Sequence, residues 1–273
     1  MITITNTTTI AAAVATIIML ETTLLAILQG IAEFLPISSS GHLVIAQELL
    51  GVNAPGMRLD IMLHVGTLLS ICVFYWTVLW RIFRTFDVKY MVNVIVSAVP
   101  AVIVYFLFRH QLEAAFEDPR MVGCALLVTG VLLLITRFLP QGTQKLTLGK
   151  ALLMGLAQAC ALVPGISRSG STLVAARCAE VESAASAEFS FLMSAPLIAG
   201  AALMEIVKAV FSTEPAAAGE ISWIMSVYGA LVAAAVGYFA LKFLLKSLKS
   251  KWFWLFGPYC LLAGAVVLVV NVI

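Results

Sequence analysis

Long apolar runs without a charged side chain are the feature that most limits the folds open to this chain. The runs at 90–108 and 252–273 contain no Asp, Glu, Lys or Arg. A helix needs roughly 20 apolar residues to cross the hydrocarbon core of a bilayer. Hydrophobic residues make up 62% of the chain and charged residues 11%, and the mean hydropathy is +1.06. Soluble domains carry about 25% charged residues, so the sequence predicts an all-α polytopic membrane protein.

Two polar segments interrupt the apolar runs, and they are near-repeats of each other. Residues 29–42 read QGIAEFLPISSSGH and residues 158–171 read QACALVPGISRSGS, with Gln, Ile, Ser, Ser and Gly recurring at a constant offset of 129 residues. The copies differ at their charged positions, since the first has Glu33 and His42 and the second has Arg168. A proline in each segment favours a break between two half-helices. Ser38 or Ser39 is the expected N-cap of the second half-helix in the first copy.

Each polar segment is flanked by short apolar runs and followed by three long ones. The expected half-helices are 10–35 with 43–50, and 148–163 with 173–179, on either side of turns that include residues 167–172. The expected spans are 61–80, 90–108, 121–138, 189–210, 221–245 and 252–273. We therefore predict an inverted-topology repeat, in which each half is a re-entrant helix pair plus three transmembrane helices.

The predicted membrane domain covers residues 19–273, with repeat one at about 19–138 and repeat two at about 148–273. Residues 1–18 are assigned to an N-terminal extension. In the alternative that residues 10–35 cross the bilayer, this topology fails at the N-terminal end.

The charges in the predicted loops divide these loops into two sets. The basic set holds Arg81, Arg84, Lys89, Arg137, Lys145, Lys150, Lys242, Lys246, Lys249 and Lys251, and the alternate loops hold Glu113, Glu117, Asp118, Glu214 and Glu220. Basic loops face the cytoplasm in most membrane proteins. The first turn is then expected to enter from the outer face and the second from the cytoplasmic face, so that the two turns meet at mid-membrane.

The charged residues of the two turns predict a polar cavity, because ionisable groups at membrane depth are costly. Gln29 and Glu33 are four residues apart and share a helix face, while Ser39 and His42 are expected to reach the mouth of the same cavity. Helix N-termini bind phosphate, and the Arg168 guanidinium can hold two phosphate oxygens. A carboxylate opposite an anion requires a compensating cation. We expect magnesium or calcium between Glu33 and a pyrophosphate.

Each of these features also has a structural interpretation. A serine-rich bend after a proline is often only a capped loop, and His42 alone can be an interfacial histidine. Gln29 and Gln158 can be amides that pack helices together. Arg168 can pair with Glu33 for structure, or bind lipid headgroups. Two copies with complementary charge favour the functional interpretation over either copy alone.

Taken together, the two motifs closely resemble those of the undecaprenyl pyrophosphate phosphatase family, membrane enzymes linked to bacitracin resistance. The signature (E/Q)xxxE followed by FLPxSSxGH is present at 29–42, PGxSRSGxT is present at 164–172, and AEFSF at 187–191 stands for the usual SEFSF. The resemblance covers about residues 20–273. This chain departs from the pattern at Gln29, which leaves Glu33 as the motif's only carboxylate. It also has His64 where glutamine, and Val163 where tryptophan, is expected.

The resemblance implies hydrolysis of undecaprenyl pyrophosphate to the monophosphate carrier in the plasma membrane, with the active site opening toward the outer face. It implies the catalytic residues Glu33, Ser39, His42 and Arg168, with Glu33 and Gln29 binding the divalent metal. The implied substrate-binding residues are Gln29, Ser38, Ser167, Ser169, Gly170, Ser171 and Thr172. Ser39 is a candidate nucleophile or phosphate ligand, and His42 its base or the acid for the leaving group. A water activated by Glu33 or His42 remains the alternative.

A transporter or lipid flippase is the rival interpretation, because inverted repeats with broken helices are the usual design of secondary carriers. The expected partners are a polyprenyl pyrophosphate lipid and membrane lipids. The sequence predicts no nucleic-acid partner, and a homodimer remains an open alternative.

Overall fold

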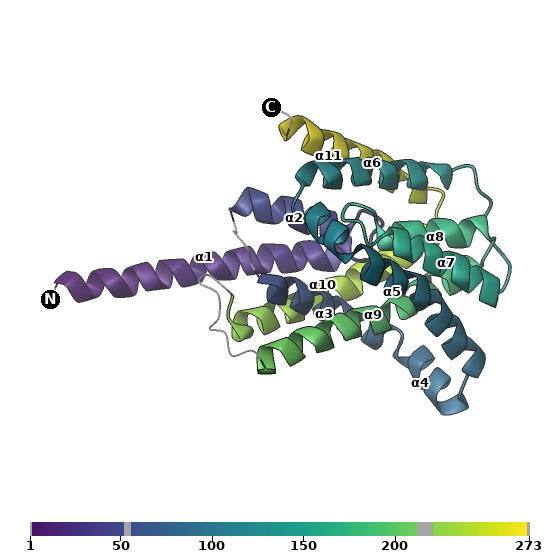
Figure 1. Cartoon of the computed structure of the whole chain (residues 1–273), viewed down its shortest axis with the longest axis horizontal. Coiled ribbons are helices and arrows are strands. Elements are labelled where there is room, and N and C mark those ends of the chain that lie inside the picture. Colours follow the sequence, from purple (N-terminus) through teal and green to yellow (C-terminus); the bar gives the residue numbers. More distant parts are fainter. Residues whose placement is uncertain (1, 52–55, 212–220, 272–273) are drawn as a thin grey trace.

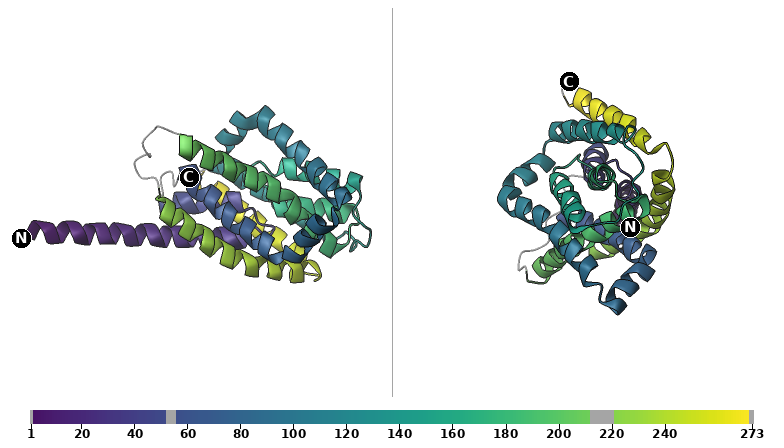
Figure 2. Two further views of the ribbon diagram at one scale, coloured as in Figure 1. Left: turned by 90° about the horizontal axis from the view of Figure 1, so that it is seen from below. Right: turned by 90° about the vertical axis from the view of Figure 1, so that its right-hand side faces the viewer.

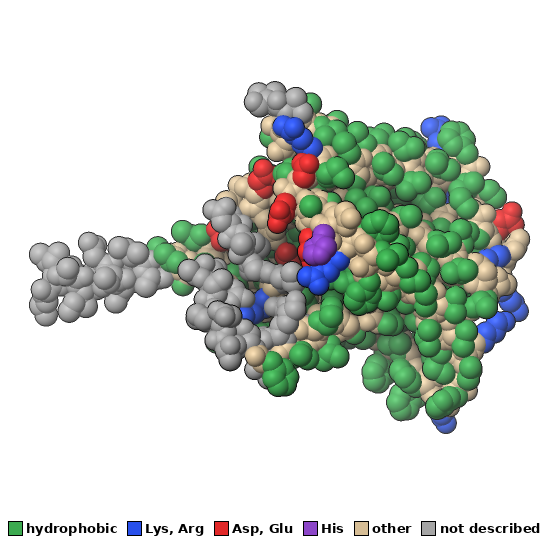
Figure 3. Space-filling model, in the orientation of Figure 1, with side chains coloured by type: hydrophobic (Ala, Val, Ile, Leu, Met, Phe, Trp, Pro, Cys, Tyr) green, Lys and Arg blue, Asp and Glu red, His purple; other side chains and the backbone are tan. Residues whose placement is uncertain are grey.

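The chain is a bundle of helices with an apolar exterior, described by a computed structural model for residues 2–51, 56–211 and 221–271. Large apolar side chains such as Phe106, Leu231 and Phe239 are exposed on the outside. In the view of Figure 3, apolar side chains cover most of the face; acidic side chains lie mainly toward its left end and several Lys and Arg at its right end. Glu214 and Glu220 lie outside the described residues.

Figures 1 and 2 show how the helices are arranged. In chain order they are α1 (Ile2–Ala32), α2 (Ser39–Leu50), α3 (Gly56–Phe74), α4 (Trp76–Thr85), α5 (Val88–Phe116), α6 (Pro119–Ile135), α7 (Leu148–Cys160), α8 (Arg168–Cys178), α9 (Ser183–Phe211), α10 (Trp223–Leu248), a 3₁₀ turn (Phe253–Leu255) and α11 (Phe256–Val270).

Among the described residues, five helices are long and apolar enough to cross a membrane, or six if the bent pair α3 and α4 counts as one span. The unbroken stretches are Ala12–Ala32, Val88–Phe116, Ser183–Met204, Trp223–Leu248 and Phe253–Val270. An apolar exterior on helices of this length is what a bilayer requires, because a helix satisfies its own backbone hydrogen bonds in lipid. The structure therefore agrees with a polytopic membrane protein.

The first helix is longer than the half-helix expected before Pro36. α1 is continuous over 31 residues, and its stretch Ala12–Ala32 is long enough to cross a membrane. No glycine or proline precedes Gly30, so nothing in the sequence interrupts the helix. The expected boundary at residue 18 falls inside α1. In Figure 1 the N-terminal part of α1 projects from the bundle and its C-terminal end reaches the interior.

Three other expected elements differ from the structure. The span expected at 61–80 is broken at Tyr75, where α3 and α4 meet at 71° although the break contains neither glycine nor proline. Arg81 and Arg84 consequently lie in α4 and not in a loop. The span expected at 121–138 is the 17-residue helix α6. The helix after the second turn begins at Arg168, five residues earlier than expected, because Ser167 caps it.

Helices from the two halves of the chain interleave. α1 packs against α10, and α7 packs against α5; α10 also packs against α3, α9 against α5, and α6 lies beside α11. The polar turns that end α1 and α7 are therefore enclosed by helices from both halves. This arrangement puts the two turns in contact inside the bundle.

The contact between the turns depends on two glycines. A Cβ atom at Gly41 would lie 3.0 Å from the Cα atom of Gly165. Gly165 has a φ of 97°, whereas the equivalent residue of the first turn is Pro36, whose ring fixes a negative φ. The first turn places its left-handed residue at Ser38 instead, with a φ of 70°. The two copies therefore reverse the chain by different backbone routes.

A serine caps the helix that follows each turn. Ser38 Oγ accepts a hydrogen bond from the Gly41 backbone N–H at 3.4 Å, and Ser167 Oγ accepts one from Gly170 N–H at 3.1 Å. Of the two N-caps considered for α2, the structure confirms Ser38.

Replacing either capping serine with alanine is expected to destabilise the protein by about 0.5–2 kcal/mol, because one N-terminal N–H loses its acceptor. Thermal unfolding in detergent measures the effect. Ser167→Thr keeps an acceptor oxygen and should unfold close to wild type. Alanine variants as stable as wild type would show that these caps do not contribute.

Candidate active site

Glu33 and Arg168 form a buried ion pair that joins the two turns. Glu33 follows the last residue of α1, and Arg168 is the first residue of α8. The Arg168 Nη2 donates to Glu33 Oε1, and the two side chains are 16% and 6% exposed. The sequence places these residues 135 positions apart. The expectation that the two charges share one site is therefore confirmed.

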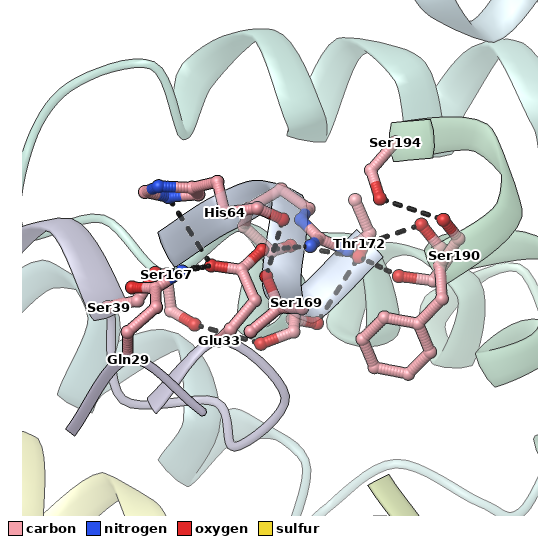
Figure 4. A network of polar contacts seen from close by, with 12 residues as sticks. Gln29, Glu33, Ser39, His64, Ser167, Ser169, Thr172, Ser190 and Ser194 are labelled. Carbon is pink, nitrogen blue, oxygen red and sulfur yellow. Dashed lines mark hydrogen bonds and ion pairs between the residues drawn. The ribbon is translucent and has the colours of Figure 1, made fainter. Parts of the chain in front are cut away.

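The second carboxylate oxygen of Glu33 is surrounded by polar groups from three helices (Figure 4). Ser39 Oγ donates to Glu33 Oε2 at 2.6 Å, and Gln29 Nε2 donates to the same oxygen at 3.1 Å. His64 Nε2, from α3, lies 3.6 Å from it. The spacing of four residues thus puts Gln29 and Glu33 on one helix face, as expected.

Residues of α9 hold the guanidinium of Arg168. Arg168 Nη1 donates to the Ser190 backbone carbonyl at 3.4 Å, and its Cζ lies 5.4 Å from the centre of the Phe191 ring. Thr172 Oγ1 donates to the Arg168 carbonyl at 2.8 Å and hydrogen-bonds to Ser190 Oγ at 2.6 Å. The aromatic face and these hydrogen bonds fix the position of a group that would otherwise be mobile.

The other serines of the second motif make hydrogen bonds that stabilise the turn, and they do not line the cavity. Ser169 Oγ donates to the Leu35 carbonyl at 3.2 Å and so ties the second turn to the first. Ser167 receives a backbone hydrogen bond from Gly170, and the Ser171 N–H donates to the Ser167 carbonyl at 2.8 Å. These contacts fix the turn from which Arg168 extends, while direct contact of Ser167, Ser169, Gly170, Ser171 and Thr172 with substrate stays a prediction.

A cavity of about 220 Å³ lies beside the ion pair. Its polar lining residues are Glu33, Ser38, Ser39, Ser40, His64, Gln158, Arg168 and Ser194. The apolar lining residues are Phe116, Ala161, Leu162, Ile166, Leu197 and Ile198. One acidic and one basic side chain among hydroxyl, amide and imidazole groups, with apolar residues on the rest of the lining, suit a charged head group attached to a lipid.

His42 is not among the residues that line this cavity. Its Nδ1 lies 2.8 Å from the Ser38 carbonyl and its Nε2 lies 2.8 Å from the hydroxyl of Tyr259 in α11. The two rings are stacked, with centres 5.6 Å apart. Ser39 lines the cavity and His42 does not, although three residues of helix place them on neighbouring positions of one face, because the Ser38 carbonyl and the Tyr259 hydroxyl hold the imidazole elsewhere. The role of His42 as an acid or base stays a prediction.

Two cavity residues have only weak signals in the sequence. The position of His64 in the sequence suits packing as well as function, yet its ring lies beside Glu33. Gln158 fits a packing amide equally well, yet it lines the cavity. Its equivalence to Gln29 in the repeat is the available signal. No sequence pattern predicts a role for Tyr259 at the site. Ser190 is indicated only by its position in the AEFSF motif.

The residues around Glu33 fit a divalent cation that is also held by phosphate oxygens. Among the described residues no group of three or more His, Cys, Asp and Glu side chains comes together as a metal site. Gln29 Oε1 is buried without a hydrogen-bond partner there, and His64, whose Nδ1 lies 2.7 Å from the Asp60 carbonyl, places its Nε2 3.6 Å from Glu33 Oε2. The Glu33 carboxylate and the unpaired Gln29 Oε1 are oxygen ligands of the kind that suits magnesium, which is often held by one or two carboxylates and the substrate.

The chain is similar to known proteins over most of its length. The family model described as bacitracin resistance protein BacA matches residues 22–266. The undecaprenyl-diphosphatase of Halothermothrix orenii is 39% identical over 90% of this chain and 95% of its own length. That of Rhodopirellula baltica is 40% identical over 93% of this chain and 98% of its own length. That of Bacteroides thetaiotaomicron is 35% identical over 92% of this chain and 98% of its own length. The chain belongs to the bacitracin resistance protein BacA family.

Proposed function

We propose that this protein is an undecaprenyl-diphosphatase, which hydrolyses undecaprenyl pyrophosphate to undecaprenyl phosphate and inorganic phosphate. The observation that carries the proposal is the Glu33–Arg168 pair, which brings both family motifs to one cavity beside Ser39. The relatives named undecaprenyl-diphosphatase support it. The reaction would recycle the lipid carrier for cell-wall synthesis and contribute to bacitracin resistance.

Arg168 is the residue proposed to bind the phosphoryl group that is transferred. Its guanidinium is anchored by Ser190 and Phe191 and points at the cavity. A fixed guanidinium stabilises the charge that develops on phosphoryl oxygens during transfer. A divalent cation held by Glu33 and Gln29 would neutralise part of the diphosphate charge.

Ser39 is the proposed nucleophile. Its hydroxyl donates to Glu33 Oε2 at 2.6 Å, which leaves the oxygen lone pairs free to face the cavity. As the Ser39 Oγ–H proton passes to its acceptor, Glu33 Oε2, attack on the terminal phosphorus forms an Oγ–P bond and breaks the bond from that phosphorus to the bridging oxygen, which leaves with the lipid monophosphate. A water oxygen then bonds to this phosphorus, the Oγ–P bond breaks, and Oγ takes back the proton from Glu33 as inorganic phosphate is released. For His42 to act as acid, its Nε2 must first exchange the Tyr259 hydroxyl for the leaving oxygen.

Ser39→Ala is expected to lower kcat for phosphate release by at least about 10²-fold, because the nucleophile is lost. Thermal stability should change little, since Ser38 and not Ser39 caps α2. Ser186→Ala is the matched control, because Ser186 is a buried serine of α9 that donates to the Ser183 carbonyl away from the cavity. Full activity in a folded Ser39→Ala protein would favour an activated water.

The test of the function is phosphate release by the purified wild-type protein. A long-chain polyprenyl pyrophosphate in detergent is supplied with magnesium, with calcium, or with a chelator. Metal-dependent release is the expected result. A folded protein that releases no phosphate under any of these conditions, but moves the lipid between vesicle leaflets, would make the carrier interpretation correct instead.

We further propose an inverted repeat in the plasma membrane with a site open to the outer face. The offset of 129 residues makes α1 equivalent to α7 and α5 equivalent to α10. The packing supports the repeat, because α1 packs on α10 and α7 packs on α5. The basic loops support the orientation. The cavity is lined by Phe116, which directly precedes the acidic residues Glu117 and Asp118 of a loop assigned to the outer side.

A further inference from the structure

Gln158 is a buried cavity residue whose amide has no partner in the fold. It lies in α7, two residues before the end of that helix, and it lines the same cavity as Glu33 and Arg168. The residue is 3% exposed, and neither Nε2 nor Oε1 has a hydrogen-bond partner within the part of the chain that the structure describes. Buried side-chain amides are nearly always hydrogen-bonded, so two free atoms in one amide require an explanation.

The internal repeat shows why this amide is free. Gln158 is equivalent to Gln29, whose Nε2 donates to Glu33 four residues further along. The residue four positions after Gln158 is Leu162, which offers no acceptor. The second copy therefore has the glutamine but not the carboxylate that occupies its amide in the first copy.

The surroundings of Gln158 point to an anionic ligand. Its neighbours in the cavity lining include apolar residues such as Leu162 and Leu197, which cannot satisfy an amide. Arg168, which pairs with Glu33, supplies positive charge to the same cavity, and Ser40 supplies a hydroxyl. Amide N–H and hydroxyl groups around a guanidinium form a donor set suited to phosphate oxygens.

We propose that Gln158 is a substrate-binding residue whose Nε2–H donates to an oxygen of the diphosphate, while Oε1 accepts from a phosphate hydroxyl or from water. This inference rests on the proposed phosphatase function. Gln158 binds the head group and does not supply a proton or a nucleophile. The amide that its counterpart Gln29 commits to Glu33 is thus reserved for the ligand.

The test is Gln158→Leu, which keeps most of the volume and removes both hydrogen-bonding atoms. KM for a long-chain polyprenyl pyrophosphate should rise roughly 10- to 100-fold, the loss expected for a hydrogen bond to a charged group, while kcat changes little. The inhibition constant of methylenediphosphonate, a non-hydrolysable diphosphate, should rise by the same factor. Thermal stability without the analogue should be unchanged or higher, because leucine leaves no buried amide unpaired.

Gln111→Leu is the control, since Gln111 is exposed on α5 and should behave as wild type. A folded Gln158→Leu protein with wild-type KM and inhibition constant would overturn the proposal and make Gln158 a packing residue.

If wild type releases no phosphate, the phosphatase proposal fails, and the thermal shift produced by methylenediphosphonate then decides the role of Gln158. A shift in wild type that is lost in Gln158→Leu supports anion binding, and an equal shift or none in both proteins overturns it.

Discussion

Arg168→Ala is expected to reduce phosphate release by at least about 10³-fold, the range observed when a guanidinium that contacts a transferred phosphoryl group is removed. The side chain is held by Ser190 and Phe191 and is directed at the cavity, and no other described Lys or Arg lines that cavity. Arg168→Lys keeps the charge and loses the planar pair of donors. Its activity should lie between those of wild type and the alanine variant.

Loss of fold has to be separated from loss of chemistry in this experiment. Removing Arg168 leaves Glu33 as a buried charge without its partner, which costs about 3–5 kcal/mol. The double variant Glu33→Gln with Arg168→Ala removes both charges, so it should recover stability while remaining inactive. Arg120→Ala is the control, because Arg120 donates to the Asn271 carbonyl at the protein surface. A stable double variant that still releases phosphate would refute the assignment of both residues.

Glu33→Gln is expected to have an equally large effect, with at least about 10³-fold less phosphate release and no remaining response to magnesium. Glutamine has nearly the same shape, but it cannot neutralise Arg168 or act as an anionic ligand. Phosphate release is measured over a magnesium titration, and magnesium binding is measured separately by calorimetry.

Glu113→Gln is the matched control for this variant. Glu113 pairs with Arg109 on the exposed part of α5, so its replacement should leave activity and the magnesium response as they are. A Glu33→Gln protein that keeps its dependence on magnesium would move the metal site away from Glu33. The Glu33–Arg168 pair would then have a structural role alone.

The spans are largely predictable because hydropathy reports which segments lie in lipid. It does not report where a helix bends or how far it continues. The break at Tyr75 contains no glycine or proline, and so it leaves no sign in the sequence. α1 runs past its expected start because its threonines and alanines contain nothing that stops a helix.

The centre of the site is predictable for a different reason. Two opposite charges in equivalent turns of a repeat have few stable arrangements other than meeting, and Glu33 and Arg168 do meet. The position of His42 is not predictable, because its partner Tyr259 lies 217 residues away in a helix with no polar pattern. The free amide of Gln158 is visible in principle, by comparing the residues that lie four positions after each glutamine of the repeat.

Because Glu33 and Arg168 lie in different halves of the chain, they are synthesised at different times. Glu33 leaves the ribosome 135 residues before Arg168, an interval of roughly 7–27 s at ordinary translation rates of about 5–20 residues per second. During that time the Glu33 carboxylate has no positively charged partner, and placing an unpaired carboxylate in the hydrocarbon core is unfavourable. The Glu33–Arg168 pair can therefore form only after the first residues of the second half have been synthesised, so that assembly of the site is a late event in the maturation of the chain.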